Sequence, residues 1–383
     1  MEQRNRWKNP VGIIIEIAAI IIADINSILI IVDDTIERRQ GKKIKAKGCY
    51  RDAVLSTGKV VVKCFGLKWV CLMLVVTLPW CQRPWALPFM TILAPSKKYN
   101  ESRGRKHKTS IDWTIIAVCV ITRWLKRPWV LIGDGGFACI RLAHACIKNN
   151  VTLVSRLRLD AALFEFAPSP VQGKCGRHRE KGARFSSLKT LAADTEQPWH
   201  DACINWYGSE TKNVRLLSGI HLWYSAGEKP LPVRWVLVVD PETNNAEAFF
   251  SIDLALAPEQ IVHWFVLRWN IEVTFFEMRA HLGMETQRQW SEKAIARTTP
   301  CLMALFSLVC VFAMEMLKNQ SLPILSTAWY NKKGEATFSD ILAFVRRSIW
   351  AKNYFNDSSF DGEYMKIRQE EWEGLLDQLA RAA

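Results

Sequence analysis

The 383-residue sequence lacks several features that define common protein classes. None of its 11 cysteines forms a CxxC pair, and the seven histidines do not cluster with them, which argues against a structural zinc site. Cysteines scattered through apolar segments are typical of small buried hydrophobic residues in a reducing compartment. The sequence also has no internal repeat and no low-complexity tract.

Long uncharged hydrophobic runs are equally scarce. Residues 12–32 are rich in Ile, but Glu16 and Asp24 interrupt them. A charge at the bilayer centre costs about 2.5–3.5 kcal/mol, so a membrane span is disfavoured there. No small-residue cleavage site follows the N-terminus, which argues against a signal peptide. Residues 300–317 approach spanning length and are expected to form a buried core helix, so we predict a cytoplasmic protein without a membrane partner.

Acidic residues are too few to balance the basic ones. Lys and Arg number 51 against 37 Asp and Glu, which gives a net charge of +14. This excess favours a polyanionic partner. The positive charge is concentrated in three segments that we expect to be loops, 38–47, 97–108 and 174–189.

Two predicted strands end in carboxylates. Residues 27–32 lead into Asp33 and Asp34, and residues 129–132 lead into Asp134. A glycine-rich turn, a helix at 137–148 and a strand at 151–154 complete an α/β unit. An aspartate at a strand end is often only a turn or helix cap, so neither position identifies a site by itself.

The segment 262–282 has helical periodicity. Its apolar side chains form one stripe, and Phe265, Arg268, Glu272 and Arg279 fall within a neighbouring arc of about 60°. Periodicity alone leaves two interpretations open. The helix is either an ordinary amphipathic helix with an i,i+4 Arg268–Glu272 pair, or it carries a metal-binding carboxylate beside phosphate-binding arginines.

Three stretches together carry a family resemblance: IVDDTIERRQGKK at 31–43, WVLIGDGGF at 129–137 and FVLRWNIEVTFFEMRAHLG at 265–283. They resemble bacterial insertion-sequence transposases of the DDE superfamily, in the branch with a β-rich insertion before the final Glu. The signature of that branch, Tyr-x2-Arg-x3-Glu-x6-Lys, is matched here by Phe265, Arg268, Glu272 and Arg279, with two conservative substitutions.

The resemblance implies an α/β, RNase H-like mixed sheet flanked by helices, with a helical C-terminal part. It implies that Asp34, Asp134 and Glu272 are the catalytic residues and hold two Mg²⁺ or Mn²⁺ ions. Asp34 is preferred over Asp33 because the ligand in this family usually directly precedes the Thr. The expected parts are an N-terminal segment (1–26), a first core part (27–155), a β-rich insertion (156–255), a second core part (256–320) and a helical C-terminal region (321–383).

The implied function is cleavage of double-stranded DNA at transposon ends and transfer of the freed strand to target DNA, with a homodimer on DNA in a bacterial, nucleoid-associated setting. The residues expected to contact DNA come from the helix and the basic segments: Phe265, Arg268, Arg279, Lys42, Lys43, Arg177 and Arg179. Two alternatives remain. One is an RNase H-like nuclease without strand transfer. The other is an inactive, truncated DNA-binding remnant, considered because only 33 residues precede Asp34.

Overall fold

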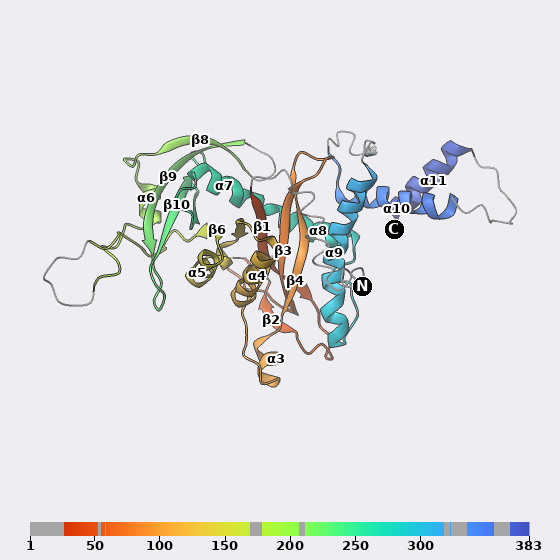
Figure 1. Ribbon diagram of the computed structural model, residues 1–383, viewed down its shortest axis with the longest axis horizontal. Helices are drawn as coiled ribbons and strands as arrows, with labels where there is room; N and C mark the ends of the chain where they lie inside the picture. Colours follow the sequence, from red (N-terminus) through yellow and green to blue (C-terminus); the bar gives the residue numbers. More distant parts are fainter. Residues whose placement is uncertain are drawn as a thin grey trace.

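The computed structural model describes residues 27–52, 55–57, 59–168, 178–206, 211–317, 322, 335–355 and 368–382 (Figure 1). Of the expected site residues, Arg177 lies outside these segments, as does the whole N-terminal segment 1–26. The fold is a mixed α/β arrangement around one sheet.

The first strand of the sheet along the chain is β1 (Ile28–Arg38), whose β-branched residues favour the extended conformation. On one side it pairs antiparallel with β3 (Lys63–Thr77), which also pairs with β2 (Gly48–Arg51) and β4 (Pro84–Ala94). On the other side it pairs parallel with β5 (Trp129–Gly133), and β5 pairs parallel with β6 (Val151–Leu157). The order β4-β3-β1-β5-β6, antiparallel and then parallel, is an RNase H-like core.

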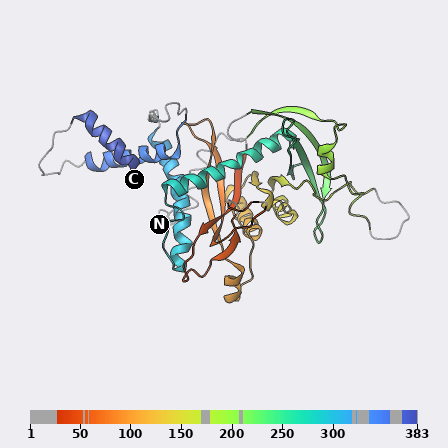
Figure 2. The same cartoon turned by 180° about the vertical axis from the view of Figure 1, so that it is seen from behind.

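Helices cover both faces of this sheet. The helices α4 (Ser110–Leu125) and α5 (Ile140–Lys148) lie on one face. On the other face, α7 (Pro258–Leu267) and α8 (Trp269–His281) cross the strands and lead to α9 (Glu292–Met316), as Figure 2 shows. A short helix, α3 (Lys97–Ser102), precedes α4, and α10 (Phe338–Phe355) and α11 (Gln369–Ala382) form the helical C-terminal part.

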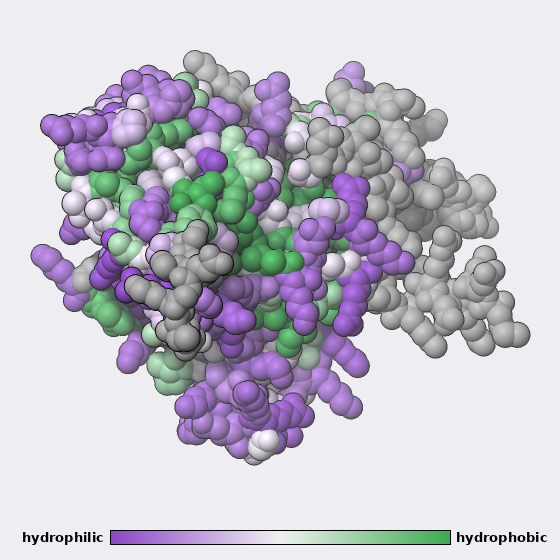
Figure 3. Space-filling view, turned by 60° about the vertical axis from the view of Figure 1, so that its left-hand side comes forward, coloured by the Kyte–Doolittle hydropathy of each residue, from purple (hydrophilic) through white to green (hydrophobic). Residues whose placement is uncertain are grey.

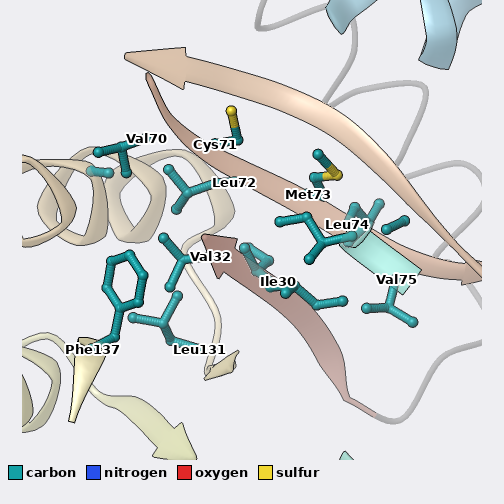
Figure 4. Close-up of a cluster of buried hydrophobic side chains, with 14 of the residues drawn as sticks. Ile30, Val32, Val70, Cys71, Leu72, Met73, Leu74, Val75, Leu131 and Phe137 are labelled. Atoms are coloured by element: carbon teal, nitrogen blue, oxygen red, sulfur yellow. The ribbon is translucent and has the colours of Figure 1, made fainter. Parts of the chain in front are cut away.

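The side chains of β1 alternate between two hydrophobic layers. Ile30 and Val32 pair with Leu74 and Leu72 of β3 and point to the same side, whereas Cys71 points to the other side (Figure 4). These residues belong to the main core. A second cluster, which includes Ile132 and residues of α7, lies on the opposite face of β5. The period of two along each strand therefore decides which helix layer a β1 side chain meets.

The β-rich segment 156–255 extends the same sheet. It contains β7 (Leu163–Phe164), α6 (Leu188–Ala193), β8 (His200–Asn205), β9 (Thr211–Trp223), β10 (Leu231–Val239) and β11 (Ala246–Ser251). Because β11 pairs with both β6 and β10, the ladder is continuous and forms an 11-stranded sheet. The segment enters the chain between β6 and α7, after Asp134 and before Glu272.

Two local expectations need correction. The basic segment 97–108, expected to be a loop, contains the helix α3, which Ser96 caps through its side chain. The expected continuous helix 262–282 is two helices, because α7 ends at Leu267 and α8 starts at Trp269.

Among the described residues, α9 is the one helix long and apolar enough to cross a membrane by length and composition. Met303, Phe306, Cys310 and Ala313 of this helix are buried, and α9 packs mainly on β4 and α10. This packing agrees with the expected core helix. The described cysteines are free thiols.

Candidate active site

The register between β1 and β5 brings two carboxylates together. The two strands run parallel, and Val32 pairs with Gly133 at the last position of the ladder. The next residues along the two strands are Asp33 and Asp134. Paired residues of neighbouring strands point to the same face of a sheet, so this register places Asp33 beside Asp134.

Asp33 faces the α7–α8 layer. Its side chain is 14% exposed, and its Oδ2 accepts a hydrogen bond from Arg268 Nη1 at 3.1 Å. The other oxygen, Oδ1, accepts a hydrogen bond from the backbone N–H of Asp34 at 2.7 Å. Asp33 is therefore a nearly buried carboxylate that is held by one guanidinium group and one backbone donor.

Asp34, which we expected to be the ligand, points to the opposite face. Its Oδ2 accepts hydrogen bonds from Ser110 Oγ at 2.6 Å and Lys68 Nζ at 3.1 Å. Ser110 begins α4, the helix on the other side of the sheet. The structure thus does not bring Asp34 together with Asp134 and Glu272, because consecutive side chains of a strand point in opposite directions. We revise the choice to Asp33.

Glu272 reaches the same face from the first turn of α8. Arg268, at the break between α7 and α8, lies 3.6 Å from Glu272 Oε1 and also contacts Asp33, so one guanidinium group bridges two carboxylates. The Arg268 side chain is only 13% exposed, and its Nε is buried without a hydrogen-bond partner among the described residues. Glu272 itself is more open, with its side chain 44% exposed.

The electrostatics of Asp33 reflect this crowding. Burial is the largest cause that raises the pKa of its carboxyl to about 7, together with the negative charges of Asp134 and Glu272 and against the opposing effect of Arg268. The neighbouring negative charges therefore make Asp33 harder to ionise without a cation. A divalent ion would relieve this repulsion, so the chemistry of the three oxygen donors fits Mg²⁺ or Mn²⁺.

The three carboxylates are not close enough to one another in this structure to share a metal ion. No group of three or more His, Cys, Asp or Glu side chains in the described segments lies close enough to hold a metal ion. Arg268 occupies the position between Asp33 and Glu272. Binding of a metal ion by all three carboxylates therefore requires this guanidinium group to move.

Asp134 is held in place by its own turn. Its Oδ1 accepts a hydrogen bond from Gly136 N at 2.8 Å, which caps a short 3-10 turn at Gly135–Phe137. The buried Ser155 hydroxyl on β6 donates to the Asp134 backbone carbonyl at 2.7 Å. These contacts fix the backbone of Asp134 at the end of β5.

Two residues of the expected DNA-binding set behave differently from each other. Arg279 lies in the last turn of α8. It donates from Nη2 to Thr35 Oγ1 at 3.1 Å and from Nε to Glu285 Oε1 at 2.8 Å. Its side chain is 37% exposed and remains available to a phosphate. Phe265 is buried, with its ring 4.5 Å from that of Phe249. We no longer expect Phe265 to contact DNA, because it belongs to the hydrophobic core.

The remaining expected DNA contacts lie on the surface, away from the carboxylates. Lys42 and Lys43 are exposed in the turn after β1, and Lys43 Nζ lies 4.8 Å from the centroid of the Trp290 ring. Arg179 is exposed at the edge of the β-rich segment. Arg177 falls outside the described residues.

The arrangement of a mixed sheet, with carboxylates at the ends of its two central parallel strands and a third on a later helix, is the one expected of a nuclease or transposase core. The sequence model of the DDE superfamily endonucleases matches residues 6–221, more than half of the chain. The chain therefore belongs to the DDE superfamily endonucleases. A search of curated proteins found no match.

The matched range includes Asp33, Asp34 and Asp134 but ends before α8. The family assignment therefore supports a nuclease- or transposase-type function that acts on DNA. It does not extend to Glu272, whose role depends on the geometry alone.

Asp33 directly precedes the residue that the resemblance implies as the ligand. The sequence shows that side chains alternate along each strand, but it does not show which alternate row faces Glu272. Counting by twos back from Asp33 gives Ile31 and Leu29, and back from Asp134 gives Ile132 and Val130, which are paired partners in the ladder. Only the register, which the sequence does not state, shows that these two rows share a face.

Proposed function

We propose that this chain is a metal-dependent DNA transposase. It would cut DNA at the ends of an insertion sequence and join the freed 3′ ends to target DNA. The observation that supports this most strongly is the row formed by Asp33 and Asp134 at the ends of parallel strands, with Glu272 close enough to perturb the pKa of Asp33.

Asp33, Asp134 and Glu272 are the residues that would hold two divalent ions. Bound ions of this type activate water as a nucleophile and stabilise the leaving 3′ oxygen during in-line displacement at phosphorus. Asp33 and Asp134 are fixed by β1 and β5, whereas Glu272 is on a helix and more exposed. The helix would therefore supply the adjustable ligand.

In this proposal, Arg268 and Arg279 bind phosphates of the DNA. Arg268 would leave Asp33 and Glu272 and pair with the phosphate at the scissile bond, where guanidinium groups form two parallel hydrogen bonds. Arg279 lies beside Thr35, two residues beyond Asp33 on the same face of β1. It would hold a neighbouring phosphate of the same strand.

Water and a DNA 3′-OH can serve in turn as the nucleophile at one site, so hydrolysis and strand transfer need no second set of residues. A dimer on paired DNA ends, and a cytoplasmic location at the nucleoid, complete the proposal. Both depend on the likeness to insertion-sequence transposases.

The test uses the full chain with labelled plasmid and oligonucleotide DNA in Mg²⁺, Mn²⁺ or EDTA, beside Asp134→Ala and Asp33→Asn. We expect metal-dependent cleavage that both substitutions abolish, and a joined donor–target product when a donor with a free 3′-OH is supplied. Asp34→Asn is the matched control because it removes a carboxylate from the same strand but from the other face.

Each alternative outcome has a distinct meaning. Cleavage that survives Asp134→Ala would overturn the assignment of the site. Metal-dependent cleavage without any joined product would replace transposition with nuclease activity. DNA binding without cleavage by the unaltered chain in either metal would contradict an active enzyme.

A further inference from the structure

On the side of the sheet opposite the carboxylates, Lys68 and Ser110, the two partners of Asp34, line a strongly basic pocket of about 790 Å³, which we call the lysine pocket. Seven lysines line it, and no Asp or Glu does. They come from the turn after β1 (Lys42, Lys45, Lys47), from β3 (Lys68) and from the segment around α3 (Lys97, Lys98, Lys108). The hydrophilic surface at the α3 end of the molecule is visible in Figure 3.

Two of the seven lysines form ion pairs with carboxylates. Lys68 forms an ion pair with Asp34, the residue on the back of the carboxylate face. Lys97 pairs with Glu101 at 3.8 Å, and both side chains are largely exposed. No ion pair is found for Lys42, Lys45 or Lys98 within the described segments. Such a concentration of positive charge in a concave site is costly unless an anion occupies it.

The pocket also offers aromatic surface. Phe65 is a large apolar residue on its wall with 54% exposure, and Lys47 Nζ lies 5.5 Å from the ring centroid. Lys68 Nζ lies over the Tyr50 ring, 5.2 Å from its centroid. Rings interleaved with lysines are what an unpaired nucleic-acid strand requires, because bases stack on rings while phosphates meet the cations.

The size of the pocket selects a single strand. A volume of about 790 Å³ is in the range of pockets that enclose small molecules, and a nucleotide or two would fill it. A duplex is far too wide to enter and would touch only the rim. The pocket is therefore suited to a strand separated from its partner.

Basic residues connect the lysine pocket with the carboxylate face around the end of β1. Lys42 also lines a second pocket, of about 420 Å³, together with Arg38, Lys43 and Glu285. Glu285 binds both Arg38 and Arg279, and Arg279 binds Thr35 beside the carboxylates. A DNA strand that extends from the cleavage site at Asp33 would follow this route around the end of β1 and reach the lysine pocket.

We propose that the lysine pocket binds an unpaired DNA strand next to the cleavage site, with phosphates on Lys42, Lys45 and Lys98 and one base on the Phe65 ring. This proposal rests on the proposed function, because the strand that the pocket would hold is the substrate of that site. It adds where the flanking strand lies and in what form.

The test measures binding without cleavage. Full-length chain carrying Asp134→Ala, in EDTA, is titrated into a fluorescein-labelled 12-nucleotide oligo(dT) strand and into the matching duplex, at several salt concentrations. Lys45→Ala with Lys98→Ala should weaken single-strand binding and reduce the salt slope by about 1.4, since each phosphate contact contributes about 0.7. Lys148→Ala with Lys229→Ala, two exposed lysines outside the pocket and outside the three basic segments, is the matched control.

Phe65→Ala separates base stacking from charge. Loss of a stacked base should weaken binding of the oligo(dT) strand about five- to 150-fold. An abasic strand of the same length should bind this variant and the parent equally. Circular dichroism of each variant, compared with the parent, checks that the fold is intact.

Equal losses in the pocket pair and the control pair, or no loss with Phe65→Ala, would overturn the proposal. So would a loss of duplex binding in the pocket pair as large as its loss of single-strand binding. Cleavage of DNA is measured separately, with Asp134 intact. Cleavage with unaltered strand binding in the pocket variants refutes only the pocket, whereas absent cleavage with the expected binding losses refutes only the transposase.

Discussion

The two faces of β1 differ in almost every property, although one strand of 11 residues builds both. The carboxylate face carries Asp33, Thr35 and Glu37 and is covered by α8 and α9, which contribute Arg268, Arg279 and Thr299. The lysine face carries Asp34 and lies under α4 and the lysine pocket. The carboxylate face is largely covered by helices, and its buried carboxylates pair with arginines. The face that carries Asp34 is open and lined by lysines. If both proposals hold, the strand separates the chemistry on one face from the binding of substrate on the other.

The largest test of this comparison is the loss of cleavage with Asp33→Asn. Removing one metal-binding carboxylate should reduce metal-dependent DNA cleavage by roughly 10³-fold, because metal catalysis contributes several kcal/mol to the transition state. Asp34→Asn should retain cleavage within about tenfold, since its partners are Lys68 and Ser110. Initial rates on labelled DNA measure both, and the reverse ranking would show that the functional face has been misassigned.

The second largest expected effect is the loss of stability when the buried Glu37 is replaced. Glu37 is 1% exposed and accepts from Arg39 at 2.7 Å, from Trp69 Nε1 at 2.8 Å and from Thr299 Oγ1 at 2.7 Å. Glu37→Ala leaves the buried Arg39 without its carboxylate partner, so the free energy of unfolding should fall by about 3–5 kcal/mol. Urea denaturation measures this. Glu37→Gln, which keeps an acceptor, should lose less, and a loss below about 1 kcal/mol for Glu37→Ala would contradict the account.

The pH dependence of stability sharpens the comparison further. The folded chain holds a proton on Asp33 up to about pH 7, well above the ordinary carboxyl pKa of 3.8. A raised folded pKa stabilises the fold at low pH, and this contribution is lost as the pH rises through 7. In EDTA, Asp33→Asn should therefore be more stable than the parent at pH 8, by about 2–4 kcal/mol, with little difference near pH 4. Denaturation of both proteins across that range measures the difference, and a gap that is constant with pH would refute the perturbed carboxyl.

The smallest expected effect belongs to the open face. The Asp34–Lys68 ion pair is partly exposed, with side chains 28% and 25% accessible. Pairs of this kind contribute about 0–1 kcal/mol, so Asp34→Asn should change the free energy of unfolding by less than about 1 kcal/mol. The same urea experiment decides this. A loss as large as that of Glu37→Ala would remove the contrast between the two faces.

Local sequence patterns were enough to predict the elements that carry the site. The β-branched run before Asp33 and the apolar run before Asp134 identify β1 and β5, because such runs favour buried strands. The family resemblance then supplied the RNase H-like fold. The strand β4 gave no such signal. It contains Pro84 and Pro88, and the β3–β4 pairing shifts register between Leu72 and Met73, next to Pro88, the kind of irregularity where proline is tolerated.

Three features depended on tertiary contacts and could not be predicted in this way. The face of Asp33 follows from the β1–β5 register rather than from the order of residues along β1. The break at Arg268 interrupts an apolar stripe whose period continues through it, so periodicity predicts one helix. The lysine pocket joins segments that begin at Lys42 and end at Ser110, and charge counts alone do not show that they meet.

The continuity of the sheet has a mechanical consequence. Backbone hydrogen bonds run unbroken from β9 through β10, β11 and β6 to β5, which carries Asp134. Such ladders are stiff in the plane of the strands, so a pull on β9 is transmitted across the sheet instead of being absorbed on the way. α7 packs on the same strands and ends at Arg268, the residue that bridges the carboxylates. Tension applied at the far end of the sheet would therefore reach both sides of the carboxylate cluster at once.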